Sequence, residues 1–249
     1  MSVFHINILT LFPDMFPGSL GLSLSGKALE DNIWSYTVID IRDFADDKHR
    51  TVDDTPYGGG AGMVMRADTI EKALLSLKDR GQLIYLSPRG RVLKQNIVRQ
   101  LIKGDSQKPP SAPVTVTLLC GRYEGVDQRV LDAYGFEEIS IGDYVLSGGE
   151  PAALILMDAC IRLLPGVMGN AETIAEESFS KGNQGLLEYP HYTRPAEWTA
   201  QNGTSYNVPD VLRSGDHAKI EQWRKNQSLA LTKTRRPELI ADSIKNKTK

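Results

Sequence analysis

Short runs rich in β-branched residues alternate with segments of helical periodicity over the first two thirds of the chain. Strands and helices that alternate in this way form a mainly parallel sheet with helices on both faces. The sequence therefore predicts an α/β domain. The expected strands are residues 4–12, 35–41, 82–87, 114–120 and 137–142, and the expected helices are residues 14–30, 67–79, 92–102, 126–134 and 151–164.

The pattern changes after Pro165. Gly, Asn, Ser, Thr and Pro become frequent, and residues 166–206 contain no convincing strand. Asp216 is a predicted N-cap for a helix at 217–231, and Pro237 suits the first turn of a last short helix. The predicted organisation is an α/β domain at 1–165, a flexible linker at 166–185 and a helical domain at 186–249. The apolar face expected on the 217–231 helix consists of Ile220, Trp223 and Leu229.

Composition limits the class of protein. Hydrophobic residues make up 41% and charged residues 24%, which excludes intrinsic disorder and a disulfide scaffold. The only two cysteines, Cys120 and Cys160, lie in apolar surroundings, as expected for reduced core thiols of a cytoplasmic protein. No run of 18 apolar residues occurs, so we expect no membrane span.

Charge is unevenly distributed along the chain. Residues 181–249 hold 12 Lys and Arg against 7 Asp and Glu, whereas residues 1–180 hold 17 against 24. A basic C-terminal third favours a polyanionic partner such as nucleic acid, although a solvated helical surface accounts for the charge equally well. Within this third, residues 188–198 interleave aromatic side chains with Arg194. They form either a platform for unpaired bases or an ordered strap on the core.

Three glycine-rich loops follow successive predicted strands: YLSPRG (85–90), CGRYEG (120–125) and IGDYVLSGGE (141–150). Ligands of open α/β sheets bind at the carboxyl ends of the strands, and glycine lets the backbone approach them closely. Three such loops favour a binding site over simple tight turns. A fourth segment, residues 42–65, lacks hydrophobic periodicity and has a glycine-rich tip, and we expect it to be functional as well.

Several familiar enzyme classes are excluded by missing motifs. The chain has no phosphate-binding GxxxxGK[ST] loop, no GxGxxG after the first strand and no GxSxG nucleophile elbow. The four histidines show no metal-ligand spacing with the cysteines, so no metal site is predicted.

Taken together, these segments resemble the bacterial tRNA (guanine-N1)-methyltransferases of the SPOUT superfamily. The resemblance covers nearly the whole chain. Many matched blocks in the same order identify the family, whereas any single block would be a weak signal. The matched blocks are HRTVDDTPYGGGAGM (49–63), YLSPRG (85–90), CGRYEG (120–125), SIGDYVLSGGE (140–150), PGVMG (165–169), PHYTRP (190–195), SGDHAKIEQWR (214–224) and RRPEL (235–239).

This resemblance implies a deep trefoil knot in the α/β domain, an obligate homodimer and an active site shared between subunits. It also implies S-adenosylmethionine as methyl donor, with magnesium as a further possibility, and tRNA as substrate, methylated at the guanosine just 3′ of the anticodon. By match of motif, the expected cofactor contacts are Tyr85, Leu86, Ser87, Pro88, Gly121, Ile141, Gly142, Asp143, Tyr144, Val145 and Leu146.

The resemblance also implies two catalytic residues, and guanine chemistry explains their roles. N1 carries a proton that a carboxylate base must accept, and an arginine can stabilise the negative charge that develops at O6. The arginine of the family precedes the PGV block and corresponds to Arg162. The family's aspartate before a Ser-Phe pair is replaced here by Glu177, with Glu176 as the alternative base.

Two other functions stay open at this point. One is a SPOUT methyltransferase with another RNA target, and the other is a non-catalytic RNA-binding protein. Retention of Arg162 and of a carboxylate at 176–177 argues against the second.

Overall fold

The computed structural model describes residues 3–104, 113–169, 176–180 and 182–240. The chain divides into two compact units, Met1–Gly169 and Asn170–Lys249, which are described separately. No helix within the described residues is long and apolar enough to cross a membrane.

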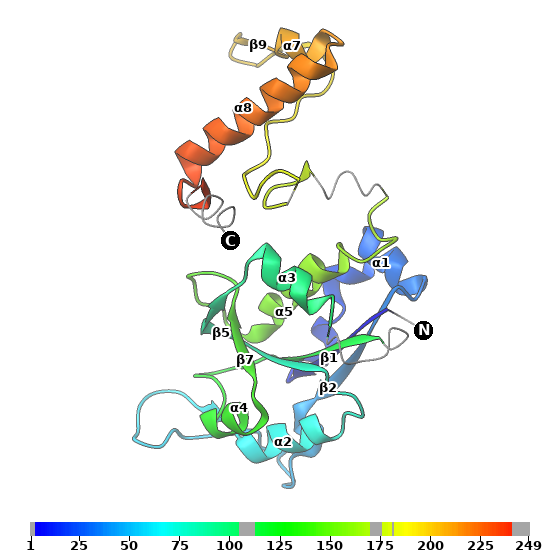
Figure 1. Ribbon diagram of the computed structural model, residues 1–249. Coiled ribbons are helices and arrows are strands. Elements are labelled where there is room, and N and C mark those ends of the chain that lie inside the picture. Colours follow the sequence, from blue (N-terminus) through cyan, green and yellow to red (C-terminus); the bar gives the residue numbers. More distant parts are fainter. Residues whose placement is uncertain (1–2, 105–112, 170–175, 181, 241–249) are drawn as a thin grey trace. The chain divides into compact units, whose positions relative to one another are not determined.

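The first unit is built on a five-stranded sheet whose strand order is β2-β1-β6-β5-β7, and every neighbouring pair is parallel (Figure 1). This confirms the predicted α/β class with a mainly parallel sheet. The strands are β1 (Phe4–Thr10), β2 (Trp34–Asp40), β5 (Gln82–Val92), β6 (Val114–Leu119) and β7 (Glu137–Ser140), and the short strands β3 (Asp53–Asp54) and β4 (Val64–Met65) form a separate antiparallel pair.

Helices cover both faces of the sheet, as the alternation predicted (Figure 1). Apolar side chains of α1, α3 and α5 join one buried cluster, and those of α2 and α4 join the other. Successive strand residues point to opposite faces, so Ile8 belongs to the first cluster and Leu9 to the second. The helices are α1 (Ser23–Glu30), α2 (Ala67–Leu75), α3 (Gln95–Leu101), α4 (Gln128–Tyr134) and α5 (Gly149–Ile161).

Several predicted boundaries in this unit were wrong. The helix expected at 14–30 is divided into the 3-10 turns η1 (Pro13–Met15) and η2 (Gly18–Gly21) and then α1, because Pro17 lacks a backbone donor and Gly18 takes a positive φ of 56°. Strand β5 continues to Val92 instead of ending at 87, and α3 starts only at Gln95.

The second unit contains a short hairpin and two helices. The hairpin corrects the expectation that residues 166–206 hold no strand: β8 (Glu197–Thr199) pairs with β9 (Ser205–Asn207) across a turn at Gly203. Helix α7 spans Asp210–Arg213 and α8 spans His217–Arg235. Asp216 caps α8 as predicted, because its Oδ1 accepts a hydrogen bond from the Lys219 amide at 3.1 Å.

The buried face of α8 agrees with the predicted one only in part. Its buried residues are Ser228 and Thr232, whereas Leu229 is 38% exposed. The Thr232 hydroxyl accepts a hydrogen bond from the Leu187 amide at 3.0 Å and donates one to the Ser228 carbonyl at 2.7 Å. Ile220 and Trp223 of the predicted face are half-buried, so the prediction is wrong at Leu229.

Candidate functional site

The three glycine-rich loops meet at one end of the sheet. Strands β6, β5 and β7 are neighbours, so the loops that leave their carboxyl ends lie side by side. They enclose a pocket of about 350 Å³. This is the arrangement that the spacing of the loops predicted.

Nearly all of the predicted cofactor contacts line this pocket. Asp143 is the exception, because it is exposed and does not line the pocket. The predicted residues that do line it are Tyr85, Leu86, Ser87, Pro88, Gly121, Ile141, Gly142, Tyr144, Val145 and Leu146.

The first loop interrupts strand β5. Leu86 and Arg91 both pair with Ile139 of β7, so the four residues between them are left out of the ladder. The Ser87 hydroxyl accepts a hydrogen bond from the Arg89 amide at 3.2 Å and supports the turn. Residues outside a ladder have backbone groups available for a ligand.

Gly121 of the second loop is required by close packing. A Cβ atom at this position would lie 2.8 Å from the Tyr85 ring and its hydroxyl oxygen. Burial raises the pKa of Tyr85, so its hydroxyl is protonated and available as a donor. The glycine thus permits the 85–90 and 120–125 loops to approach across the pocket.

The 42–65 segment docks onto the second loop. Its end is held by backbone hydrogen bonds from Glu124 to the Met63 carbonyl and from Met65 to the Gly125 carbonyl, both at 3.0 Å. Its tip is exposed, and the Tyr57 side chain is fully accessible. The sequence pattern indicated function for this segment, and the fold brings it beside the pocket.

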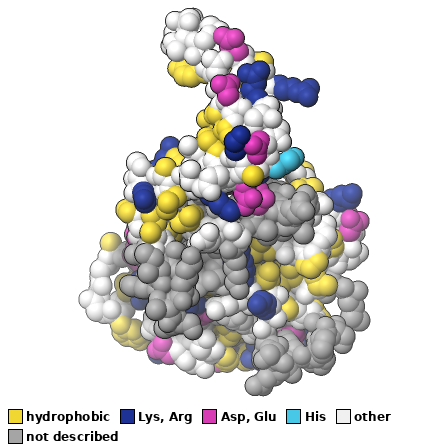
Figure 2. Space-filling model, turned by 45° about the horizontal axis from the view of Figure 1, so that its top comes forward, with side chains coloured by type: hydrophobic (Ala, Val, Ile, Leu, Met, Phe, Trp, Pro, Cys, Tyr) yellow, Lys and Arg dark blue, Asp and Glu magenta, His cyan; other side chains and the backbone are white. Residues whose placement is uncertain are grey.

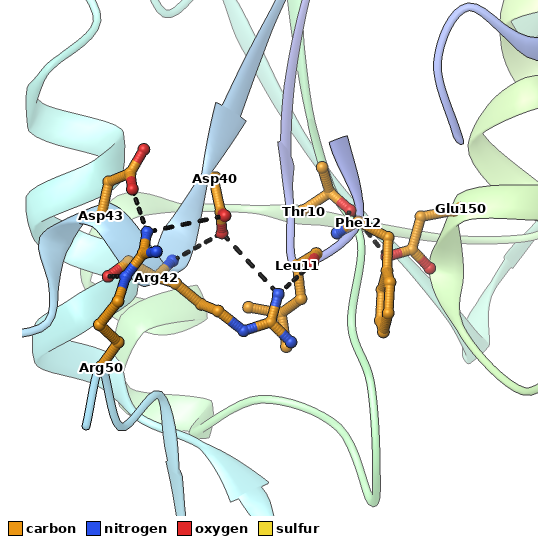
Figure 3. A network of polar contacts seen from close by, with 8 residues as sticks. All are labelled: Thr10, Leu11, Phe12, Asp40, Arg42, Asp43, Arg50 and Glu150. Carbon is orange, nitrogen blue, oxygen red and sulfur yellow. Dashed lines mark hydrogen bonds and ion pairs between the residues drawn. The ribbon is translucent and has the colours of Figure 1, made fainter. Parts of the chain in front are cut away.

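The base of the same segment is joined to the end of β1 by charged side chains (Figure 3). Arg42 donates to the carbonyl of Leu11 and lies 4.0 Å from Asp40. Arg50 lies 3.8 Å from Asp40 and also binds Asp43. Asp40 therefore holds two guanidinium groups at this point.

A larger and more open hollow of about 1090 Å³ lies between the 54–68 segment and α4. We place the functional site in the smaller pocket, because three strand-end loops converge there and the larger hollow contains none of the predicted cofactor contacts. Within the described residues, no three His, Cys, Asp or Glu side chains cluster as metal ligands would. Both cysteines are buried and free, and burial raises the pKa of both thiols, that of Cys160 to about 12, which disfavours the reactive thiolate.

Arg162 lies far from the pocket of its own chain. It is the C-cap of α5, and its amide donates to the Asp158 carbonyl at 3.1 Å. The other end of this helix, Gly149, lines the pocket. Helix α5 has 13 residues. At about 1.5 Å per residue it is about 20 Å long, well beyond the reach of an arginine side chain.

The two candidate bases belong to the second unit. A Glu176 carboxylate oxygen accepts a hydrogen bond from the Tyr189 hydroxyl at 3.1 Å and lies 3.9 Å from an Arg224 nitrogen. The Arg224 guanidinium lies over the Tyr189 ring at 4.9 Å. Glu176 is thereby tied to α8, while the Glu177 carbonyl accepts from the Ser180 amide at 3.1 Å and closes a turn.

The aromatic segment at 188–198 is packed in part against α8. Tyr189 packs against α8 through Arg224, and the Tyr192 ring lies 6.2 Å from that of Trp223. Tyr192 and Trp198 nevertheless stay about half exposed, at 48% and 58%. Figure 2 shows basic and hydrophobic side chains next to each other on the described surface of this unit.

The fold and the pocket define an α/β protein with a ligand site made of loops at the carboxyl ends of parallel strands, the usual place for a cofactor in this class. The sequence model of the family tRNA (Guanine-1)-methyltransferase TrmD matches residues 4–242, and the chain belongs to this family.

Relatives match over almost their full length. A tRNA (guanine-N(1)-)-methyltransferase of Rhodospirillum rubrum is 57% identical over 242 residues, which covers 97% of this chain and 94% of the relative. Proteins of the same name from Wolbachia pipientis wMel and Rhizobium etli are 54% and 53% identical, each over 247 residues and 98% of this chain. The aligned part covers 98% of the Wolbachia protein and 99% of the Rhizobium protein.

Proposed function

We propose that this protein transfers the methyl group of S-adenosylmethionine to N1 of the guanosine just 3′ of the anticodon in tRNA. The observation that carries the proposal is the family match over residues 4–242, which includes the three loops of the pocket. The relatives are named for methylation of guanine N1 in tRNA.

The pocket suits the proposed cofactor. Its volume of about 350 Å³ lies in the range of roughly 300–1,000 Å³ typical of small-molecule sites. Its walls consist mainly of glycine-rich backbone with the apolar Leu86, Ile141 and Leu146, which suits an adenine ring and the hydrogen bonds of its edge. Bound there, S-adenosylmethionine supplies a methyl group already activated by the sulfonium.

The residues of this chain perform the remaining chemistry. Glu177 accepts the N1 proton of guanine, for which it must lie about 2.6–3.2 Å away. Arg162 stabilises the negative charge that develops at O6. Glu176 is the alternative base, and the Tyr189 hydroxyl and Arg224 contact its carboxylate.

The proposal includes a homodimer with shared active sites. Arg162 and the pocket lie at opposite ends of α5, about 20 Å apart by helical rise, so one chain does not bring them together. In a two-fold symmetric pair, the arginine of one copy can complete the pocket of the other. Exposed apolar side chains at the pocket rim, Tyr144 at 50% and Val145 at 83%, also suit a surface covered in the assembly.

Two features of the resemblance belong to the same proposal. The loops of the pocket form a deep trefoil knot, and residues 186–249 form a domain that holds tRNA. Support for tRNA binding comes from the excess of Lys and Arg in residues 181–249 and from the half-exposed aromatic rings of Tyr192 and Trp198.

We expect the protein to act in the cytoplasm. Magnesium stays a prediction of the resemblance, and no ligands are assigned to it.

The proposed function predicts dependence on one nucleotide of the substrate. The purified protein, tRNA transcripts and labelled S-adenosylmethionine are combined, and the modified position is mapped. Transcripts with guanosine 3′ of the anticodon should be methylated at N1, whereas transcripts with adenosine there should not, since adenine N1 carries no proton and presents no O6. Methylation elsewhere in the tRNA would favour the alternative of another RNA target, and binding without methylation would favour a non-catalytic protein.

The pocket geometry predicts a defect in Gly121→Ala. The added methyl group would lie 2.8 Å from Tyr85, and overpacking of this kind costs roughly 1–3 kcal/mol. We expect the Kd for S-adenosylmethionine, measured by calorimetry, to rise roughly 10-fold or more. Gly169→Ala is the control, since nothing lies within 4 Å of its added methyl group. Equal affinity in both variants would contradict this placement of the cofactor.

A further inference from the structure

A buried charged cluster lies directly behind the pocket loops. The Glu150 carboxylate, in the first turn of α5, is fully buried. Its Oε1 accepts a hydrogen bond from the hydroxyl of Thr10, at the end of β1, at 2.7 Å (Figure 3). Its Oε2 lies 2.9 Å from Nε of Arg122. A buried carboxylate is costly unless it is paired and hydrogen-bonded, and Arg122 and Thr10 provide these two contacts.

Arg122 joins the second loop to the third. It belongs to the 120–125 loop, and it holds the 141–150 loop at two places: Nε is paired with Glu150, and Nη1 donates to the Ser147 carbonyl at 3.2 Å. Its guanidinium also lies over the Phe12 ring, with Cζ 4.2 Å from the ring centroid. The Arg122 side chain is 17% exposed and contributes to the pocket lining.

The 120–125 and 141–150 loops are closely packed against each other. A Cβ atom at Gly148 would lie 2.3 Å from Nε of Arg122, so only glycine fits beside the guanidinium. The Gly149 amide donates to the Gly121 carbonyl at 2.9 Å, which fixes the two backbones against each other. The loop that carries Tyr144, Val145 and Leu146 is therefore anchored at its end by Arg122 and Glu150.

The pair is a charge contact without an aligned hydrogen bond. Nε of Arg122 and Oε2 of Glu150 are both buried, and neither has a hydrogen-bond partner in the structure despite their 2.9 Å separation. A buried pair of this kind adds little net stability compared with apolar side chains, because desolvation offsets the attraction. Its position between two pocket loops points to a role in shaping the site.

We propose that Arg122 and Glu150 are positioning residues for the methyl donor, which hold the 120–125 and 141–150 loops in the arrangement that forms the pocket. This inference rests on the proposed function and deepens it. The pair acts through the loops: Glu150 lies behind them, fixed by Thr10, and Arg122 transmits its position to Ser147 and Gly148.

The test measures cofactor binding, substrate binding and stability in one set of variants. Glu150→Gln, Arg122→Gln, the double variant and Thr10→Val are compared with the parent by calorimetry with S-adenosylmethionine, by KM for tRNA and by thermal unfolding. The double variant is included because a single substitution leaves a buried charge without its partner and can destabilise the fold. Glu137→Gln is the control, since Glu137 pairs with Arg91 in an exposed ion pair between β7 and β5.

We expect the Kd for S-adenosylmethionine to rise roughly 10-fold or more in the double variant, with KM for tRNA changed less than about twofold. The two single effects should not add, because both remove one interaction. Arg122→Lys should restore part of the affinity that Arg122→Gln loses. The control should bind as the parent does.

Parental affinity in a folded double variant and in Thr10→Val would overturn the inference and leave only a structural ion pair. If the Kd for S-adenosylmethionine and the KM for tRNA rise equally and the Tm falls in parallel, the inference is overturned as well. Absence of cofactor binding by the parent itself would overturn the proposed function, and with it this inference.

Discussion

Glu177→Gln should lower the single-turnover rate of methyl transfer by roughly 10²–10⁴-fold, the usual contribution of a positioned acid–base group. The amide preserves size and hydrogen bonding but cannot accept the N1 proton. Affinity for S-adenosylmethionine should hardly change, because the Glu177 carboxylate is assigned to the N1 proton and is not needed to hold the cofactor. Rapid-quench measurements at saturating cofactor and tRNA give the rate without a contribution from product release.

Glu176→Gln is the matched control one residue away. Its amide can still accept a hydrogen bond from the Tyr189 hydroxyl, so we expect a rate within about threefold of the parent. If both variants keep the parental rate, the base lies elsewhere in the chain. If only Glu176→Gln loses activity, Glu176 is the base and its contacts with Tyr189 and Arg224 must open during the reaction.

Glu177→Asp then tests which side-chain length brings the carboxylate to guanine N1. The family motif has aspartate at this position, and the glutamate side chain is longer by one methylene group. A faster aspartate variant would mean that the extra methylene hinders proton transfer, whereas a slower one would mean that the surrounding segment is adapted to glutamate.

The sequence was sufficient for the sheet and the pocket for a physical reason. Alternating apolar strands and amphipathic helices determine a parallel α/β core, and glycines at strand ends mark where backbone is exposed. The sequence was insufficient where contacts between residues far apart in the chain determine the structure. Strand β5 extends beyond residue 87 because Arg91 and Val92 pair with β7 after a looped-out turn, and no local signal encodes that pairing.

Side-chain partners across long sequence separations were missed in the same way. Glu150 follows two loop glycines and gives no sign of burial, yet Thr10 and Arg122 hold it in the core. On α8, Ile220 and Trp223 of the predicted apolar face are half-buried, but Leu229 is exposed, and the fully buried residues are Ser228 and Thr232. Periodicity detects apolar faces only and is blind to a helix packed through hydroxyl groups.

The second large effect on the methyl-transfer rate is expected for substitution of Arg162. Arg162→Ala should lower the methyl-transfer rate roughly 10²–10³-fold, as expected for loss of a group that stabilises developing oxyanion charge. Cofactor binding should be retained, because Arg162 is assigned to guanine O6 and does not belong to the lining of the cofactor pocket. Arg162→Lys should recover part of the rate, since it restores the positive charge without the planar fork.

Mixed dimers distinguish a shared site from a site within one chain. Arg162→Ala is combined with Gly121→Leu, a variant first checked by calorimetry for loss of cofactor binding and by thermal unfolding for an intact fold. If Arg162 serves the partner's pocket, each mixed dimer has one intact site: the Gly121 pocket of the Arg162→Ala chain, completed by the arginine of the other. An equal mixture should recover about a quarter of parental activity, since half of the dimers are mixed and each has one of two sites. Differently tagged chains verify that subunits have exchanged. An exchanged mixture as inactive as its components would mean that Arg162 acts on its own chain's pocket, and the shared active site would have to be abandoned.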